Sequence, residues 1–318
     1  MFRHLLAISC MYVAITCHAS DDVQISAAPA EHNYANDFVT FWDATRTLPP
    51  NEQIAEFKKT VGARFPEFYG VSRYGGKRSQ AEQDKVIANA INSFGPIRQA
   101  YIDKVNAFGT DLRRHISSFQ AAFPDFKQDT PIYLLHSLGE MDGGTRDLAG
   151  KNHLIFGAEQ MVRYHGNGNE SAFFHHELFH IHHSAQMGQC PEAGVWKSLW
   201  SEGLASYVSS VLNPHASDKE MLLDLPSGVV AATRAQMPVA LAQLEKVLDS
   251  EDGELYGELF TMSGKSKGLP ARRGYYLGYL VAAEAGKSRD LSSLAKLNCK
   301  EARAVVNSAL NQLQAHSK

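Results

Sequence analysis

Five of the chain's 14 histidines fall within nine residues, between His175 and His183. Apolar residues in and beside this segment recur every three or four positions, which is the spacing of one side of an α-helix. These residues are Phe174, Leu178, Ile181 and Ala185. A helix with such a stripe packs that side into a hydrophobic core. The segment is therefore predicted to be a helix whose histidine side faces away from the core.

The histidine side of this helix carries an H-E-x-x-H pattern, His176-Glu177-Leu178-Phe179-His180. At 3.6 residues per turn, His176 and His180 project from one side about 6 Å apart. Two imidazoles so placed can bind one zinc ion at about 2.0–2.1 Å each. Glu177 is turned about 60° from His180, where it can act as a general base toward water at the metal. His183 lies near the same side, so His180 with His183 is a rival pair.

A second segment, residues 200–207, supplies a candidate third ligand. An apolar stripe runs along it, and Glu202 stands opposite that stripe. Gly203 has no side chain, which would let this helix approach the histidine helix closely. A carboxylate added to two histidines completes a catalytic zinc site whose fourth position is open to water.

Together the two segments resemble the gluzincin metallopeptidases. The segment Glu202-Gly203-Leu204-Ala205-x-Tyr207 is similar to the glutamate-containing helix of M1-type aminopeptidases. The combination of H-E-x-x-H with E-G-L-A is closer to a family of predicted zinc-dependent proteases, often exported by bacteria. The similarity extends from about Ile132 to Gly278, with residues 142–145 and 274–278 as further points. It implies one Zn²⁺ per chain, with Glu177 as the general base and three ligands: His176, His180 and Glu202.

The resemblance also suggests the remaining parts of a peptidase site. Tyr275 and Tyr276, on a helix after Pro270, are candidates for a second oxyanion donor, with core packing as the alternative. A strand at residues 153–156 would hold an extended peptide at its edge. His165 is either a further donor or a surface histidine. Thermolysin-like relatives carry an aspartate where this chain has Ser206, so the ligand histidines must be oriented differently.

These features predict a zinc metallopeptidase that acts on a peptide or protein. One alternative is a non-catalytic metal- or protein-binding module, since clustered histidines suit metal capture. The intact Glu177 argues against it, because storage needs no general base. A zinc amidase that cleaves a non-peptide amide would use the same residues.

The rest of the sequence predicts an α+β, mostly helical fold: a zincin-like catalytic core with a small sheet, flanked by N- and C-terminal helices. Residues 20–128 are expected to form an N-terminal helical region, and residues 129–318 the core with a C-terminal helical part. Strands are expected at residues 131–135 and 152–156, with a turn at residues 141–144.

The N-terminus and the overall composition indicate the protein's environment. Residues 1–19 are predicted to be a signal peptide cleaved after Ala19, so the protein is expected to be exported, periplasmic or secreted. A lipid anchor on Cys17 is a less favoured alternative, because Thr16 before it fits poorly. The net charge of −3 shows no excess of positive charge for binding nucleic acid. No apolar run after the N-terminus is long enough to span a bilayer. Cleavage would leave Cys190 and Cys299, either as a disulfide or as two free thiols.

Overall fold

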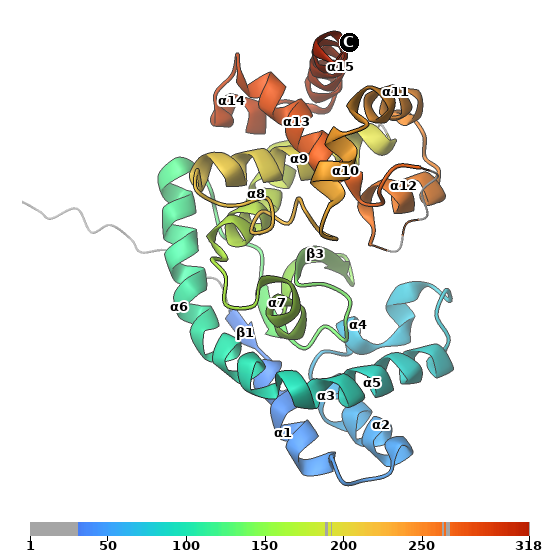
Figure 1. Cartoon of the computed structure of the whole chain (residues 1–318). Coiled ribbons are helices and arrows are strands. Elements are labelled where there is room, and N and C mark those ends of the chain that lie inside the picture. The colour runs from blue at the N-terminus through green and yellow to red at the C-terminus, as the bar shows by residue number, and fades with distance from the viewer. Residues whose placement is uncertain (1–30, 188–189, 192, 263, 265–267, 318) are drawn as a thin grey trace, which may run out of the picture.

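The computed structural model describes residues 31–187, 190–191, 193–262, 264 and 268–317. The expected signal peptide, its cleavage after Ala19 and the alternative lipid anchor on Cys17 lie outside the described residues. Helices make up most of the described chain, together with a small four-stranded mixed sheet (Figure 1). The prediction of an α+β, mostly helical fold is therefore confirmed.

The sheet has the strand order β1-β2-β4-β3, with β1 at Glu31–Asn33, β2 at Ile132–Leu135, β4 at Lys151–Gly157 and β3 at Gly143–Leu148. Strand β2 runs parallel to both β1 and β4, whereas β3 pairs antiparallel with β4. The predicted strands at residues 131–135 and 152–156 correspond to β2 and β4.

The expected turn at residues 141–144 is wrong, because Gly143 and Gly144 begin the edge strand β3. The turn after β2 comes earlier, at Leu138 and Gly139, and a separate tight turn between β3 and β4 lies at Ala149 and Gly150, where both residues have positive φ angles of 53° and 78°. Two such residues match the twist of the strands that a two-residue hairpin connects. Glycine disfavours strands, so the sequence of β3 carried little signal for one.

The N-terminal region is helical up to the second strand. Five helices precede a long one: α1 (Ala35–Thr45), α2 (Pro50–Lys59), α3 (Val61–Arg64), α4 (Pro66–Tyr69) and α5 (Gln80–Phe94). Short 3₁₀ turns occupy Val71–Tyr74 and Gly95–Ile97. The 25-residue helix α6 (Arg98–Ala122) runs along one side of the molecule, from α1 and α5 toward α8 (Figure 1).

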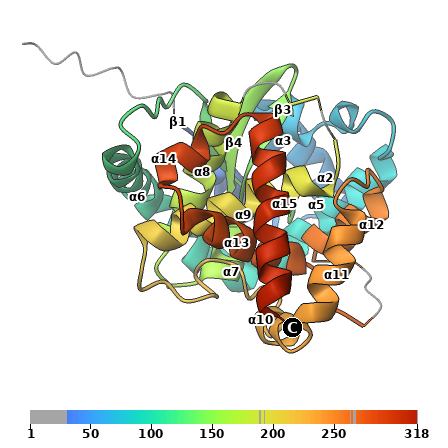
Figure 2. The same cartoon turned by 90° about the horizontal axis from the view of Figure 1, so that it is seen from above.

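The chain after the sheet is again helical. Its helices are α7 (Ala158–His165), α8 (Ser171–Met187), α9 (Val195–Leu212), α10 (Val229–Arg234), α11 (Met237–Val247), α12 (Gly253–Phe260), α13 (Arg273–Gly286), α14 (Leu291–Ala295) and α15 (Cys299–His316). Helix α13 packs against both α9 and α15, and Figure 2 shows α15 lying across these two helices. A disulfide joins Cys190, after α8, to Cys299 at the start of α15.

One hydrophobic core runs through both predicted regions. It extends from Ala35 in α1 to Leu310 in α15, and β1 joins the sheet beside β2. Helix α6 also packs against α7 and α8. The expected boundary near residue 128 therefore does not separate two cores. None of the helices in the described part of the chain is both long and apolar enough to cross a lipid bilayer.

Candidate metal centre

The histidine segment forms helix α8, as its periodicity predicts. Phe174 and Leu178 on its apolar side are fully buried, and Phe174 contacts the rings of Phe108 in α6 and Phe156 in β4. The opposite side carries His176 and His180, which line a cleft. The packing of α8 against α6 and the sheet therefore fixes the direction in which the two histidines point.

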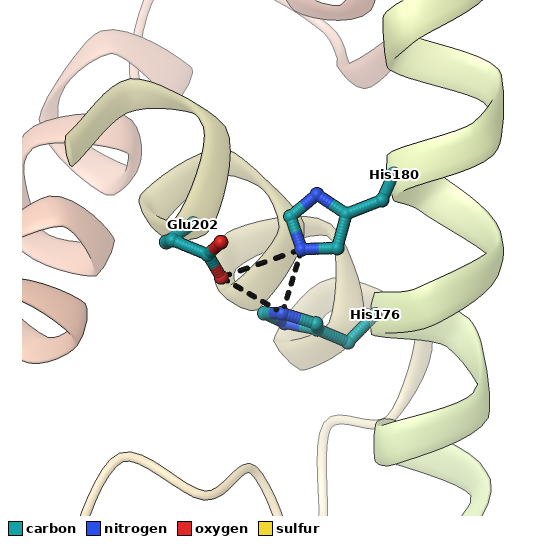
Figure 3. Close-up of side chains that lie close together, drawn as sticks. All are labelled: His176, His180 and Glu202. Atoms are coloured by element: carbon teal, nitrogen blue, oxygen red, sulfur yellow. Dashed lines mark hydrogen bonds and ion pairs between the residues drawn. The ribbon is translucent and has the colours of Figure 1, made fainter. Parts of the chain in front are cut away.

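Three side chains converge on one point in this cleft (Figure 3). The Nε2 atoms of His176 and His180 lie 3.0 Å apart, and each lies 3.3 Å from Oε2 of Glu202 in α9. Tetrahedral ligands at about 2.0–2.1 Å from a metal lie about 3.3 Å from one another. Within the described residues, these three form the group whose ligand atoms could hold a metal ion. The predicted ligand set is thus brought together.

The electrostatics of this group also fit a cation. Burial lowers the pKa of His176. Burial opposes ionisation of Glu202 too, but His180 and the hydrogen bonds from both histidines hold its pKa well below the ordinary range. The charge of Glu202 outweighs burial at His180 and raises that pKa to about 9. In the metal-free chain a proton on His180 balances the carboxylate, and metal binding releases such protons.

Glu177 lies beside the three ligands without joining them. Its side chain is buried, and its Oε2 has no hydrogen-bond partner among the described residues. Burial raises the pKa of Glu177 to about 8. Gly143 of β3 makes room for it, because a Cβ there would lie 2.7 Å from the Phe173 ring and 2.9 Å from Cγ of Glu177. Gly143 belongs to residues 142–145, which resemble the protease family, but the sequence alone did not predict its proximity to Glu177.

The cleft has a volume of about 840 Å³ and two different walls. One wall is the loop at residues 139–142 with the first residues of β3. The other wall comes from the C-terminal helices and their connections and is largely apolar. Its apolar members are Met221, Leu222, Leu225, Tyr256, Phe260, Met262 and Tyr275.

The structure separates the two candidate tyrosines. Tyr275 lines the cleft, with its ring 6.5 Å from the ring of His176. Burial raises the pKa of Tyr275 well above the ordinary value, so its hydroxyl stays protonated. Tyr276 points away from the cleft into a small cluster with Leu223 and Val230, and its hydroxyl accepts hydrogen bonds from Arg234. The candidate role of Tyr276 as an oxyanion donor is therefore withdrawn, because successive helical residues face different sides.

Ser201 is a site residue that the sequence analysis missed. Its Oγ lies 3.4 Å from Nδ1 of His180, on the side of the ring opposite the metal position. Ser206 is buried, but its Oγ has no partner among the described residues. Ser206 therefore does not make the contact that an aspartate makes in thermolysin-like sites. The sequence feature that could have indicated Ser201 is its position next to the predicted ligand Glu202.

The other histidines of α8 are buried away from the metal position. His175 contacts Ser118 Oγ at 2.7 Å and Asn213 Nδ2 at 2.9 Å. His182 lies near Asp125, and the ring of His183 stacks on Phe179. The rival pair of His180 with His183 is therefore not formed.

His165, a candidate donor or surface residue in the sequence analysis, is neither exposed nor in the cleft lining. Its side chain is 2% exposed, and its Nε2 lies 3.0 Å from Oδ2 of Asp142. Asp142 itself lines the cleft beside Gly143. His165 thus supports one wall of the cleft through Asp142.

Gly203 allows a close helix crossing, but with a different partner from the one expected. A Cβ on Gly203 would overlap the backbone of Gly278 in α13, not α8. The expectation that Gly203 brings α9 against the histidine helix is therefore wrong. Instead the pair Gly203 and Gly278 sets the distance between α9 and α13, the helices that carry Glu202 and Tyr275.

The expected substrate strand is also reassigned. Strand β4 lies between β2 and β3, so both of its edges are already paired. Strand β3 is the edge strand, and its residues 143–146 line the cleft. An extended chain could add to the sheet only beside β3 on this side.

Comparisons with protein-family models, with curated proteins and with solved structures gave no match to this chain. The fold and the site define an α+β protein with a candidate metal centre of two histidines and one glutamate, set in a cleft beside a sheet edge.

Proposed function

We propose that this protein is a gluzincin-type zinc peptidase with a zincin-like core. In this proposal one zinc ion is held by His176, His180 and Glu202, and Glu177 is the general base. The observation that carries it is the convergence of three ligand atoms within 3.3 Å, with a buried carboxylate beside them that has an unpartnered oxygen.

The donor set supports zinc among the transition metals. Two neutral imidazoles and one carboxylate are the ligands of several catalytic zinc sites, which leave a fourth position open. Zinc bound there would polarise the substrate carbonyl and lower the pKa of a water molecule to about 7. The remaining steps belong to residues of the chain.

Glu177 has the environment that a general base needs. Burial makes its carboxylate more basic than an exposed one, since the pKa is raised to about 8. It would accept the proton of the attacking water and pass it to the leaving amine. Tyr275, which stays protonated, would donate a hydrogen bond to the oxyanion.

The edge of β3 is the proposed binding site for the peptide backbone. Its residues line the cleft, and an exposed sheet edge can pair with an extended segment through main-chain hydrogen bonds. The cleft volume of about 840 Å³ lies within the range of sites that bind small molecules.

Two observations bear on the alternatives and on the location. His175, His182 and His183 are buried away from the metal position, and among the described residues only His176, His180 and Glu202 form a group that could hold an ion, which argues against a multi-ion store. The Cys190–Cys299 disulfide supports export, because disulfides persist in oxidising compartments. A zinc amidase acting on a non-peptide amide remains the second candidate for the same centre.

The test is digestion of a diverse peptide mixture by the mature, zinc-loaded protein, read by mass spectrometry. Wild type is expected to cleave, and the cut positions would distinguish trimming of ends from internal cleavage. Glu177→Gln should keep its zinc and lose at least about 10²-fold in rate, because the general base is removed. Cleavage by Glu177→Gln at the wild-type rate would contradict the mechanism. No cleavage by either protein would favour the amidase or a binding role.

A further inference from the structure

Arg272 holds a positive charge at the apolar wall of the cleft. The residue is 7% exposed, lines the cleft and immediately precedes α13. Its Nη1 donates hydrogen bonds to the carbonyl oxygens of Leu222 at 2.6 Å and Leu225 at 3.0 Å. Its guanidinium carbon lies 3.9 Å from the centre of the Tyr275 ring. These contacts fix the guanidinium in one place.

The charge of Arg272 has no carboxylate to balance it among the described residues. Its hydrogen bonds end on two neutral carbonyls, and its Nε and Nη2 make none within this part of the chain. Arg146, the other arginine of the cleft, is different, because its Nε lies 3.1 Å from Glu140, which also pairs with Arg73. A buried charge is costly unless it is paired. The Arg272 guanidinium can therefore form an ion pair with an anionic group of a ligand.

Arg272 also lies at a useful distance from the metal centre. The guanidinium carbon of Arg272 lies 3.9 Å from the centre of the Tyr275 ring, and that ring lies 6.5 Å from the ring of His176. The guanidinium is thus within about 10 Å of the His176 ring, a distance that about three extended residues span.

The backbone of Arg272 has an unusual conformation. Its φ of +62° is in the left-handed region, which few residues other than glycine adopt. The backbone N–H is held by the carbonyl of Glu258 at 3.0 Å. Such conformations persist where the surroundings enforce them, and they are enriched at functional sites.

We propose that Arg272 anchors a carboxylate of the substrate, within three residues of the bond that is cleaved. The inference rests on the proposed peptidase function and adds a substrate class to it. The free Nε and Nη2 edge of a guanidinium matches the two oxygens of a carboxylate. The carboxylate could be the C-terminal group of a short peptide or an aspartate or glutamate side chain.

Matched peptides distinguish the two sources. A peptide that wild type cleaves is made with a free C-terminal acid and as the C-terminal amide. A second pair keeps the amide and places aspartate or asparagine within three residues of the cleaved bond. Wild type is expected to prefer one acid over its neutral partner by about 10- to 100-fold in kcat/KM, as a charged hydrogen bond allows. The preferred pair identifies the source.

Arg272→Gln should bring that preference ratio close to one, and Arg272→Lys should keep part of it. Arg234→Gln is the control, because Arg234 is exposed and contacts Tyr276 outside the cleft. An equal loss of activity on both members of a pair in Arg272→Gln would mean a purely structural arginine and would overturn the proposal. Loss of the ratio in Arg146→Gln alone would also overturn it.

Binding to the zinc-free protein gives a readout that needs neither hydrolysis nor metal. Calorimetric titration of Glu177→Gln with each pair should show the same preference for the acid, abolished by adding Arg272→Gln. Equal affinity for both members of each pair would overturn the proposal. If wild type cleaves no peptide, the same pairs are made on a peptide of arbitrary sequence, and a preference for the acid in binding would then refute the peptidase function and leave the anchor standing. Cleavage without preference would refute the anchor alone.

Discussion

Two carboxylates in the cleft have opposite environments. Glu202 faces two histidines, whose charge and hydrogen bonds keep its pKa low despite burial. Glu177 lies nearby without a partner for one oxygen, and burial raises its pKa to about 8. A pair of titratable groups whose pKa values are displaced in opposite directions is typical of divided roles. Glu202 is suited to be an anionic ligand, and Glu177 to exchange protons.

Tyr275 provides the next test at the level of single residues. Tyr275→Phe removes the proposed donor to the oxyanion while keeping the ring that stacks on Arg272. We expect kcat to fall by about 10²- to 10³-fold, as loss of one oxyanion donor does elsewhere, with a smaller change in KM. Steady-state kinetics on a cleaved peptide measure both values.

Tyr276→Phe is the matched control, because its hydroxyl contacts Arg234 outside the cleft. It should leave kcat near the wild-type value. A large loss in Tyr276→Phe together with full activity in Tyr275→Phe would show that the cleft assignment of the two tyrosines is reversed.

The metal centre depends on how closely helices α9 and α13 cross. Gly203→Ala would place a methyl group against the backbone of Gly278, so the helices must separate. We expect a loss of about 1–3 kcal/mol in the free energy of unfolding, the usual cost of overpacking. Zinc affinity should fall as well, because Glu202 moves with α9. Urea unfolding and zinc titration measure the two effects.

Gly253→Ala serves as the control for this substitution. Gly253 begins α12, and a Cβ there would meet no atom within 4 Å. Stability and zinc affinity should stay at or slightly above the wild-type values. If Gly203→Ala behaves like Gly253→Ala, the close crossing does not position Glu202.

Local sequence patterns predicted the helices that carry the site better than they predicted which elements pack against one another. The stripe beginning at Phe174 predicted α8, and the spacing of His176 and His180 predicted two ligands on one side, because both follow from one helix's own geometry. The partner of Gly203 could not be predicted in this way, since it depends on the tertiary path of α13. Strand β3 was not predicted because it begins with two glycines, which are unfavourable in strands. Gly143 is needed there because a larger residue would collide with Phe173 and Glu177.

At the scale of the whole molecule, the cleft is built by one continuous core. Helices from both ends of the chain pack on the sheet and α8, and the Cys190–Cys299 disulfide closes a loop across 109 residues. The residues that line the cleft come from β3 and the loop before it, from α8 and α9, and from the C-terminal helices and their connections. Changes that weaken the core are therefore expected to reach the metal centre.

Buried histidines predict how stability depends on pH. Burial lowers the pKa of His115 and His175 to about 4 and of His183 to about 3. The unfolded chain binds protons at these positions below about pH 6.5, and the folded chain does not. The free energy of unfolding of the metal-free protein should therefore fall as the pH drops from 6.5 toward 4. Glu177 has the opposite effect, because its raised pKa means that the folded chain binds a proton there before the unfolded chain does. It is one group against three histidines.

Urea unfolding at several pH values between 7.5 and 4.5 measures this dependence. His115→Gln should make the decline shallower, because it removes one buried imidazole without adding charge. An unfolding free energy that stays constant or rises toward pH 4.5 would show that these histidines do not remain neutral in the folded protein.

In the proposed centre three residues hold one zinc ion, and Glu177 lies outside the ligand set. The most direct measurement is the zinc content and affinity of the purified protein after metal removal and titration, for wild type and four variants. Wild type and Glu177→Gln should each bind one tight zinc per chain. His176→Ala, His180→Ala and Glu202→Ala should each bind far more weakly, because one of three ligands is gone. Unchanged affinity in Glu202→Ala, or several ions per wild-type chain, would contradict the proposed single three-ligand centre.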